Sequence, residues 1–187
     1  MSETQIRFSG SGGQGLQLAS KILASALAHE GRSISMSQSY EPTSRGGLSR
    51  SDLVVDSSAG YPLVTEIDFL IILDQLAVEN SVGLIGNNAR VIIDIERVDC
   101  PPAGEHMTTA LPLIQGAREV GNIRAANVVA LGAILAISSI CAQESRLQAI
   151  HDTVPARFLD LNLEAFKQGY GLVVTHRNAK PQLTAVN

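Results

Sequence analysis

A glycine-rich run near the N-terminus constrains the fold more than any other part of the sequence: Gly10-Ser11-Gly12-Gly13-Gln14-Gly15. Before it, Ile6 and Phe8 alternate with polar residues, as in a short strand. After it, apolar residues recur at helical spacing and Gly31 follows as a helix stop; they are Leu16, Ala19, Leu23, Ala26 and Leu27. The pattern predicts a strand, a glycine loop and a helix in succession over residues 5–30.

A loop of this kind favours a phosphate ligand. Glycines let the backbone approach the phosphate closely, and the free amides at the start of the helix attract its charge. A dinucleotide site also needs an acidic residue about 20 residues further on, at the end of the next strand. The segment from Ser33 to Gln38 has none, and the first acid is Glu41. A phosphate ligand other than NAD, or a tight turn needed only for packing, therefore remains.

The other periodic segments predict an α/β protein. Apolar, β-rich runs lie at Leu53–Val55, Phe69–Leu73, Val91–Ile95 and Leu172–Val174, and residues 75–85, 124–140 and 159–169 favour helices. Continuous apolar strands separated by helices indicate a sheet buried on both faces. We expect a three-layer α/β/α fold with a largely parallel, Rossmann-like sheet. Residues 1–187 are expected to form one domain, with a flexible tail from about residue 178.

A second polar loop spans Ser39 to Gly47 and contains Arg45. Its proline and glycines make it irregular, and the planar guanidinium of Arg45 suits bidentate contacts with phosphate or carboxylate. Ligands of α/β sheets bind at the carboxyl ends of strands, where such loops lie. We predict that Gly10, Ser11, Gly12, Gly13, Gln14, Gly15 and Arg45 form the binding site, with a salt bridge as the alternative role of Arg45.

The remaining polar residues favour structural roles, and no catalytic residue or metal site is predicted. Asp68, Asp74 and Asp94 flank β-like runs, where carboxylates usually cap the next helix. We expect Asn122 to cap a helix and Asn127 to make a hydrogen bond between helices or across an interface. The histidines form no HxxxH or HExxH motif.

Composition excludes several functional classes. The formal net charge of -4 gives no basic field to attract nucleic acid or an anionic membrane. The most apolar stretch, Val128–Ile137, is shorter than the ~20 residues needed to cross a bilayer. The N-terminus lacks the pattern of a signal peptide, so we expect a cytoplasmic protein. Cys100 and Cys141 are far apart in sequence and cannot alone supply the ligands of an iron–sulfur cluster.

Five motifs in order resemble one family, the gamma subunit or fused gamma domain of the pyruvate, 2-oxoglutarate and 2-oxoisovalerate ferredoxin oxidoreductases. The similarity covers nearly the whole chain. The motifs are Gly10–Gly15; Ser39-Tyr40 with Pro42 and Arg45-Gly46-Gly47; Asp68-Phe69-Leu70 to Asp74; Asn122 with Ala126–Gly132; and Asn162–Phe166 with Gly169.

The resemblance implies a role within a complex. Such enzymes oxidatively decarboxylate a 2-oxoacid with thiamine diphosphate, pass electrons through [4Fe–4S] clusters to ferredoxin, and release an acyl-CoA. The thiamine diphosphate and the clusters are expected on partner subunits, namely alpha, beta and a ferredoxin-like delta subunit. The glycine loop is expected to contact coenzyme A, and the isolated chain is expected to be inactive.

Three alternatives stay open at the level of sequence. One is the similar beta subunit of indolepyruvate ferredoxin oxidoreductase. Another is a stand-alone Rossmann-type nucleotide-binding protein, which would need the missing ribose-binding acid. A protein whose glycine turn serves only packing is a further possibility. The sequence does not identify the 2-oxoacid.

Overall fold

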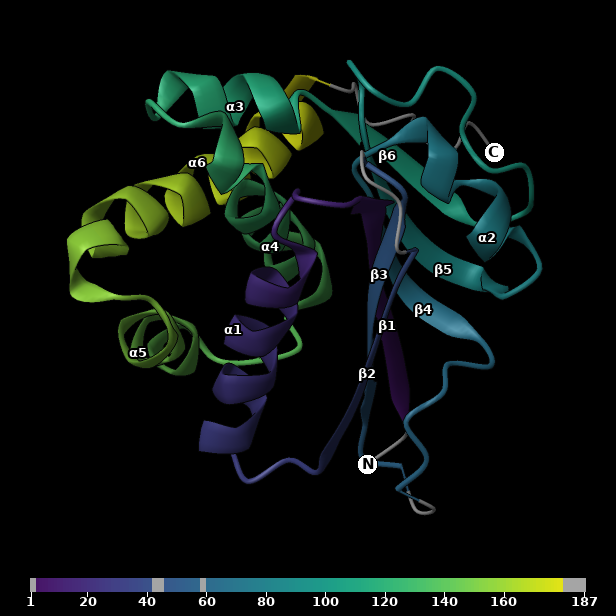
Figure 1. The fold of residues 1–187 in the computed structure, drawn as a ribbon, viewed down its shortest axis with the longest axis horizontal. Coiled ribbons are helices and arrows are strands. Elements are labelled where there is room, and N and C mark those ends of the chain that lie inside the picture. The colour runs from purple at the N-terminus through teal and green to yellow at the C-terminus, as the bar shows by residue number, and fades with distance from the viewer. Residues whose placement is uncertain (1–2, 42–45, 58–59, 180–187) are drawn as a thin grey trace, which may run out of the picture.

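The computed structural model describes residues 3–41, 46–57 and 60–179. Within these ranges, all six strands lie in the first part of the chain, with α1 and α2 between them, and helices make up the last part (Figure 1). The strands are β1 (Thr4–Ser11), β2 (Ile34–Tyr40), β3 (Leu48–Val55), β4 (Ile67–Ile72), β5 (Ile85–Asp94) and β6 (Met107–Leu111). The α-helices are α1 (Leu16–His29), α2 (Glu79–Val82), α3 (Leu113–Glu119), α4 (Ala126–Ser138), α5 (Gln143–Thr153) and α6 (Leu159–Ala179). Single 3₁₀ turns are η1 (Gln75–Ala77), η2 (Ile123–Ala125) and η3 (Ala156–Phe158).

The strands form one sheet in the order β2-β3-β1-β4-β5-β6. Strands β1, β4, β5 and β6 pair in parallel, whereas β3 runs antiparallel to both of its neighbours. This mixed, mostly parallel sheet confirms the predicted α/β class. Because β3 separates β2 from β1, the end of β2 does not adjoin β1, where a dinucleotide-binding fold has its ribose-binding acid.

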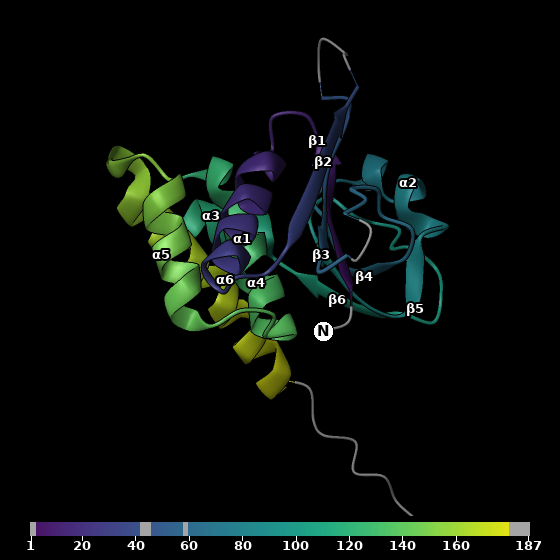
Figure 2. The same ribbon diagram turned by 90° about the horizontal axis from the view of Figure 1, so that it is seen from below.

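The two faces of the sheet are covered unequally (Figure 2). Helices α1, α3 and α4 pack on one face, and α5 and α6 pack mainly on α1 and α4. The other face carries η1, α2 and loops over a smaller core, which includes Leu70, Ile72, Val91 and Ile93. Of the two chain segments on that face, residues 73–84 hold only η1 and the short α2, and residues 95–106 hold no helix, so its layer is thin.

Helix α4 is apolar on nearly all sides because it lies inside the helical layer. Every residue from Ala126 to Ala136 is buried. At its crossing with α6 the two backbones meet directly. A Cβ added to Gly132 would collide with the carbonyl oxygen of Phe166, and a Cβ added to Gly169 would collide with that of Val129. Only glycine fits at these two positions.

A buried ion pair joins β1 to β3. The guanidinium of Arg7 donates to both carboxylate oxygens of Asp52, at 2.7 and 2.8 Å, and the two residues are paired in register. Arg7 also donates to the backbone carbonyl of Asn80, at 3.2 Å. Both side chains are almost fully buried, so each charge depends on the other.

Several predicted elements differ from the structure. The segment Leu172–Val174 lies within α6 and is not a strand, because Val173 packs into the helical core. Residues 75–85 form η1 and the short α2 instead of one helix. The sequence did not predict β6, α3 and α5. Across the described part of the chain, no helix has the length and apolar character needed to cross a membrane.

Candidate functional site

The predicted glycine loop lies at the carboxyl end of β1, as expected. Gly13 and Gly15 have φ angles of 90° and 74°, which favour glycine, and Gly15 is the N-cap of α1. Gly12, Gly13 and Gly15 are exposed. Among the described residues, the backbone amides of Gly13, Gly15 and Leu16 have no hydrogen-bond partner. The loop therefore presents free N–H groups at the positive end of a helix of 14 residues.

Gln14 holds the loop in this shape. Its Oε1 accepts a hydrogen bond from the Ser11 amide at 2.8 Å, and its Nε2 donates to the Leu73 carbonyl at 3.0 Å. A Cβ added to Gly10 would collide with the Gln14 side chain. Gln14 thus ties the loop to the end of β4, and the close approach explains why glycine stands at position 10.

The second predicted loop contacts the glycine loop through the part of it that the structure describes, which begins at Gly46. The amide of Gly12 donates to the carbonyl of Gly47 at 2.8 Å. Gly46 has a φ of 65°. Arg45 lies outside the described residues, together with Pro42, Thr43 and Ser44. The structure therefore brings the two loops together, and the role of Arg45 stays a prediction.

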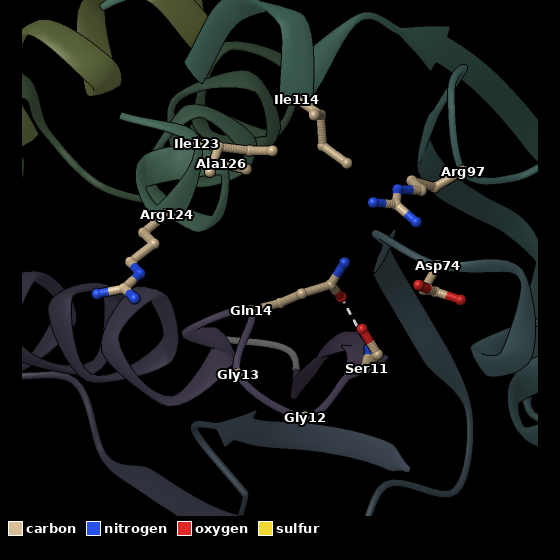
Figure 3. Close-up of a pocket in the computed structure, with 10 residues that line it drawn as sticks. All are labelled: Ser11, Gly12, Gly13, Gln14, Asp74, Arg97, Ile114, Ile123, Arg124 and Ala126. Atoms are coloured by element: carbon tan, nitrogen blue, oxygen red, sulfur yellow. Dashed lines mark hydrogen bonds between the residues drawn. The ribbon is translucent and has the colours of Figure 1, made fainter. Parts of the chain in front are cut away.

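A cleft of about 270 Å³ opens above the glycine loop. Ser11, Gly12, Gly13 and Gln14 form its floor, and Arg97 and Arg124 lie on opposite sides of it (Figure 3). Both arginines are exposed, and within the described ranges neither guanidinium has a hydrogen-bond or ion-pair partner. Two cations and several free amides around one cleft suit a negatively charged group. We name it the glycine-loop cleft.

Neither Arg97 nor Arg124 was among the binding residues predicted from the sequence. Arg97 follows β5 by a few residues and Arg124 lies in η2, far from the glycine loop in sequence. A usable signal existed for Arg97, because it comes just after a predicted strand, and the carboxyl ends of parallel strands meet at one edge of the sheet. Arg124 lies beside Asn122, a residue that was singled out only as a cap.

The two asparagines have the roles expected from sequence. Asn122 Oδ1 accepts from the Arg124 amide at 3.0 Å and caps η2. Asn127 Nδ2 donates to the Gly15 carbonyl at 2.7 Å, which links α4 to the N-cap of α1. A Cβ at Gly15 would lie 2.7 Å from that same Nδ2. Asn127 therefore fixes the last residue of the glycine loop.

The three aspartates make structural contacts. Asp74 caps η1 and also lines the glycine-loop cleft, where it is the single carboxylate among the lining residues of the described chain. Asp94 is fully buried and accepts from the amides of Glu96 and Ile114, at 2.9 and 2.8 Å. Burial raises the pKa of Asp94 despite these hydrogen bonds. Asp68 accepts from the Gln5 amide at 2.8 Å.

Comparison with known proteins agrees with the motifs. The family described as "Pyruvate ferredoxin/flavodoxin oxidoreductase" matches residues 5–172. The 2-oxoglutarate synthase subunit KorC of Methanocaldococcus jannaschii is 36% identical over 171 residues, which cover 89% of this chain and 91% of that protein. The indolepyruvate oxidoreductase subunit IorB of Methanothermobacter thermautotrophicus is 25% identical over 183 residues. The relatives thus favour the gamma-subunit interpretation over the indolepyruvate alternative.

Two solved structures share the fold. The gamma subunit of a keto/oxoacid ferredoxin oxidoreductase from Geobacter sulfurreducens matches with a TM-score of 0.83 and 35% identity, over 94% of this chain and 98% of that one. A 2-oxoglutarate:ferredoxin oxidoreductase from Magnetococcus marinus, with 2-oxoglutarate, coenzyme A and succinyl-CoA bound, matches with a TM-score of 0.82 and 22% identity. That match covers 97% of this chain and 32% of the larger one. By its sequence motifs, its full-length relatives and its fold, the chain belongs to the pyruvate ferredoxin/flavodoxin oxidoreductase family.

Proposed function

We propose that the glycine-loop cleft binds phosphate groups of coenzyme A within a 2-oxoacid:ferredoxin oxidoreductase. The observation that carries this proposal is the arrangement of Arg97 and Arg124 on either side of the free amides at the start of α1. Coenzyme A carries a pyrophosphate and a 3′-phosphate, and both groups suit guanidinium forks and backbone N–H donors. The coenzyme A bound in the Magnetococcus marinus enzyme supports the choice of ligand.

In this proposal the chain binds and orients coenzyme A and performs no bond-making step itself. The whole enzyme decarboxylates a 2-oxoacid, reduces ferredoxin and releases an acyl-CoA. The [4Fe–4S] clusters are assigned to partner subunits, because this chain has two cysteines and a cluster takes four thiolates. Thiamine diphosphate is assigned to partner subunits as well, as the family resemblance implies. Gly10, Ser11 and Gln14 shape the loop, Gly12, Gly13 and Gly15 present its backbone, and Arg45 is a proposed further contact.

The enzyme complex in this proposal contains several further subunits. We propose alpha, beta and delta partner subunits, ferredoxin as electron acceptor, and a single gamma-type domain formed by the whole chain. The similarity to KorC supports 2-oxoglutarate as the 2-oxoacid. Cys100 and Cys141 are free thiols, which suits a reducing cytoplasm.

The test uses the assembled complex. Arg97→Gln and Arg124→Gln should each raise the KM for coenzyme A about 10- to 100-fold, since a hydrogen bond to a charged group contributes ~1.5–3 kcal/mol. The matched control is Arg90→Gln, which removes an exposed arginine of β5 that does not line the glycine-loop cleft. Unchanged coenzyme A kinetics in both cleft variants would refute the proposed ligand.

A further inference from the structure

A pocket of about 330 Å³ lies between α5 and α6. It is formed by the first two turns of α5 and the middle of α6, and α5 lies on the outer side of the helical layer, away from the sheet (Figure 2). None of its lining residues also lines the glycine-loop cleft. We name it the α5–α6 pocket; its lining includes Arg146, Leu147, Phe166, Lys167 and Tyr170.

Arg146 is a buried cation at this pocket. The residue is 9% exposed, and its Nε and Nη2 both donate to the backbone carbonyl of Cys141, which carries no net charge. Among the described residues, the guanidinium of Arg146 forms no ion pair, and its Nη1 donates no hydrogen bond. The carboxylate of Glu30 accepts instead from the amide of Ala142, at 2.6 Å. A buried charge is costly without an opposite charge, so Arg146 lacks a carboxylate from outside the chain.

The surroundings of Arg146 are also cationic. Lys167 lines the same pocket and is mostly exposed, with only a loose ion pair to Glu164 at 3.7 Å. The lining residues within the described ranges include no carboxylate. From residue 165 to residue 179, α6 carries Lys167, His176 and Arg177 and neither Asp nor Glu, although the chain as a whole has a net charge of -4. This surface therefore favours an acidic partner.

An apolar stripe continues from the pocket along α6. Phe166, Tyr170 and Val174 follow one another at four-residue spacing, so they lie on one side of the helix. Phe166 is buried, whereas Tyr170 is 41% and Val174 45% exposed. Leu147 of α5 is half-buried in the same pocket. Apolar and aromatic side chains around an arginine are typical of the centre of a protein–protein interface.

We infer that the α5–α6 pocket docks a segment of a partner subunit in which an Asp or Glu carboxylate lies next to a large apolar side chain. The carboxylate pairs with Arg146 and is attracted by Lys167, and the apolar side chain packs against Leu147 and Tyr170. The charge of the pocket and its apolar stripe select for this combination. This inference rests on the proposed function, because it requires the partner subunits of the complex. It assigns assembly and coenzyme A binding to separate surfaces of the chain.

The experiment is a competition for incorporation into the assembled complex. Wild-type and variant chains are expressed together with the partner subunits, and mass spectrometry compares their ratio in the purified complex with their ratio in the soluble pool. Tyr170→Ala should be incorporated about 10-fold less than wild type or worse, as expected for an aromatic side chain at the centre of an interface. Lys167→Glu should be incorporated several-fold less, because it repels the partner's carboxylate. Lys21→Glu is the matched control, since Lys21 is exposed on α1 and does not line the pocket.

Arg146→Gln tests the buried cation directly. Glutamine keeps an N–H donor for the Cys141 carbonyl but removes the charge, so incorporation should fall about 30-fold or more. A thermal melt of the isolated chain shows whether this variant is folded. If its Tm falls by several degrees, Tyr170→Ala and Lys167→Glu decide the question without it.

Cross-linking identifies the occupant. The photo-reactive residue p-benzoylphenylalanine in place of Tyr170 should form a cross-link to a partner subunit in the assembled complex, within a peptide that contains Asp or Glu. A cross-link to a second copy of this chain, or to a partner peptide without an acidic residue, would overturn the inference.

The outcomes separate this inference from the proposed function. If Tyr170→Ala and Lys167→Glu are incorporated as well as wild type while Arg97→Gln raises the KM for coenzyme A, the docking surface is wrong and the proposed function stands. If the wild-type chain does not co-purify with the thiamine-binding partner subunits, both the inference and the proposed function fail.

Discussion

Replacing Gly15 with alanine should destabilise the chain through two separate effects. The φ of 74° costs an alanine roughly 1–2 kcal/mol, because its Cβ approaches the backbone. The new Cβ would also lie 2.7 Å from Asn127 Nδ2 and 3.1 Å from its Cγ. Asn127 is buried beneath the loop and must move, which breaks its hydrogen bond to Gly15 and costs ~1–3 kcal/mol. The sum is about 2–5 kcal/mol.

The same loop supplies the control. Gly13 also has a positive φ, of 90°, but a Cβ there meets no atom within 4 Å. Gly13→Ala should therefore cost only the backbone share, ~1–2 kcal/mol. For a chain of this length, 1 kcal/mol corresponds to ~2–4 °C in Tm. Thermal and urea denaturation should thus show a loss of roughly 5–20 °C for Gly15→Ala and a clearly smaller loss for Gly13→Ala.

A double-mutant cycle tests whether the Asn127 side chain is the group that a Cβ at position 15 would meet. In an Asn127→Ala background the added Cβ at residue 15 no longer meets an amide, so Gly15→Ala should cost about as much as Gly13→Ala, ~1–2 kcal/mol. If Gly15→Ala still lowers the free energy of unfolding by its full amount in that background, the Asn127 side chain is not the group that excludes a Cβ at position 15. Equal costs of the two single alanine variants would refute the steric argument in the same way.

Three further predictions concern charge. Arg7→Met should lower the free energy of unfolding, measured in urea, by ~3–5 kcal/mol, because it leaves the buried carboxylate of Asp52 without its partner. Arg7→Met/Asp52→Leu should be more stable than Arg7→Met alone, and a less stable double variant would contradict the buried ion pair. Burial raises the pKa of Asp94 above 3.8, so its protonation favours the folded state, and that contribution is lost as pH rises through the folded pKa. Asp94→Asn should therefore gain stability relative to wild type as pH rises from about 4, and a constant difference in urea titrations would exclude this. Arg45→Ala should change the stability of the isolated chain by no more than ~1 kcal/mol yet impair assembly or coenzyme A use, whereas a Tm loss of several degrees would make Arg45 structural.

The parts of the fold with a local signal could be predicted from sequence. The strand, loop and helix around Gly10–Gly15 carry their own periodicity and turn residues, and α4 is continuously apolar. The segment Leu172–Val174 misled the prediction because β-branched residues favour strands in isolation. In the folded chain, packing against the helical core outweighs that weak preference.

The functional site could likewise be predicted only in part from the sequence. The glycine loop could be predicted because each glycine answers a backbone requirement within a few residues. Arg97 had only one signal, its place just after a predicted strand, because the parallel pairing of β1, β4 and β5 is what brings it to the loop. Arg124 had no distinctive local pattern in the sequence. The pairing of Arg7 with Asp52 was likewise hidden, because it depends on β3 running antiparallel beside β1.

The glycine crossing of α4 and α6 bears on selectivity. Asn127 on α4 and Asn162 on α6 both line a pocket of about 270 Å³ beside Arg124, so the spacing of these two helices helps to set the width of that pocket. With Gly132 and Gly169 the backbones are already in contact, so the helices cannot move closer, and any larger residue would force them apart. The crossing therefore sets a fixed distance between the two helices that line this pocket. A pocket with rigid walls loses little entropy when a ligand binds, and it excludes groups that are wider than the fixed helix spacing allows.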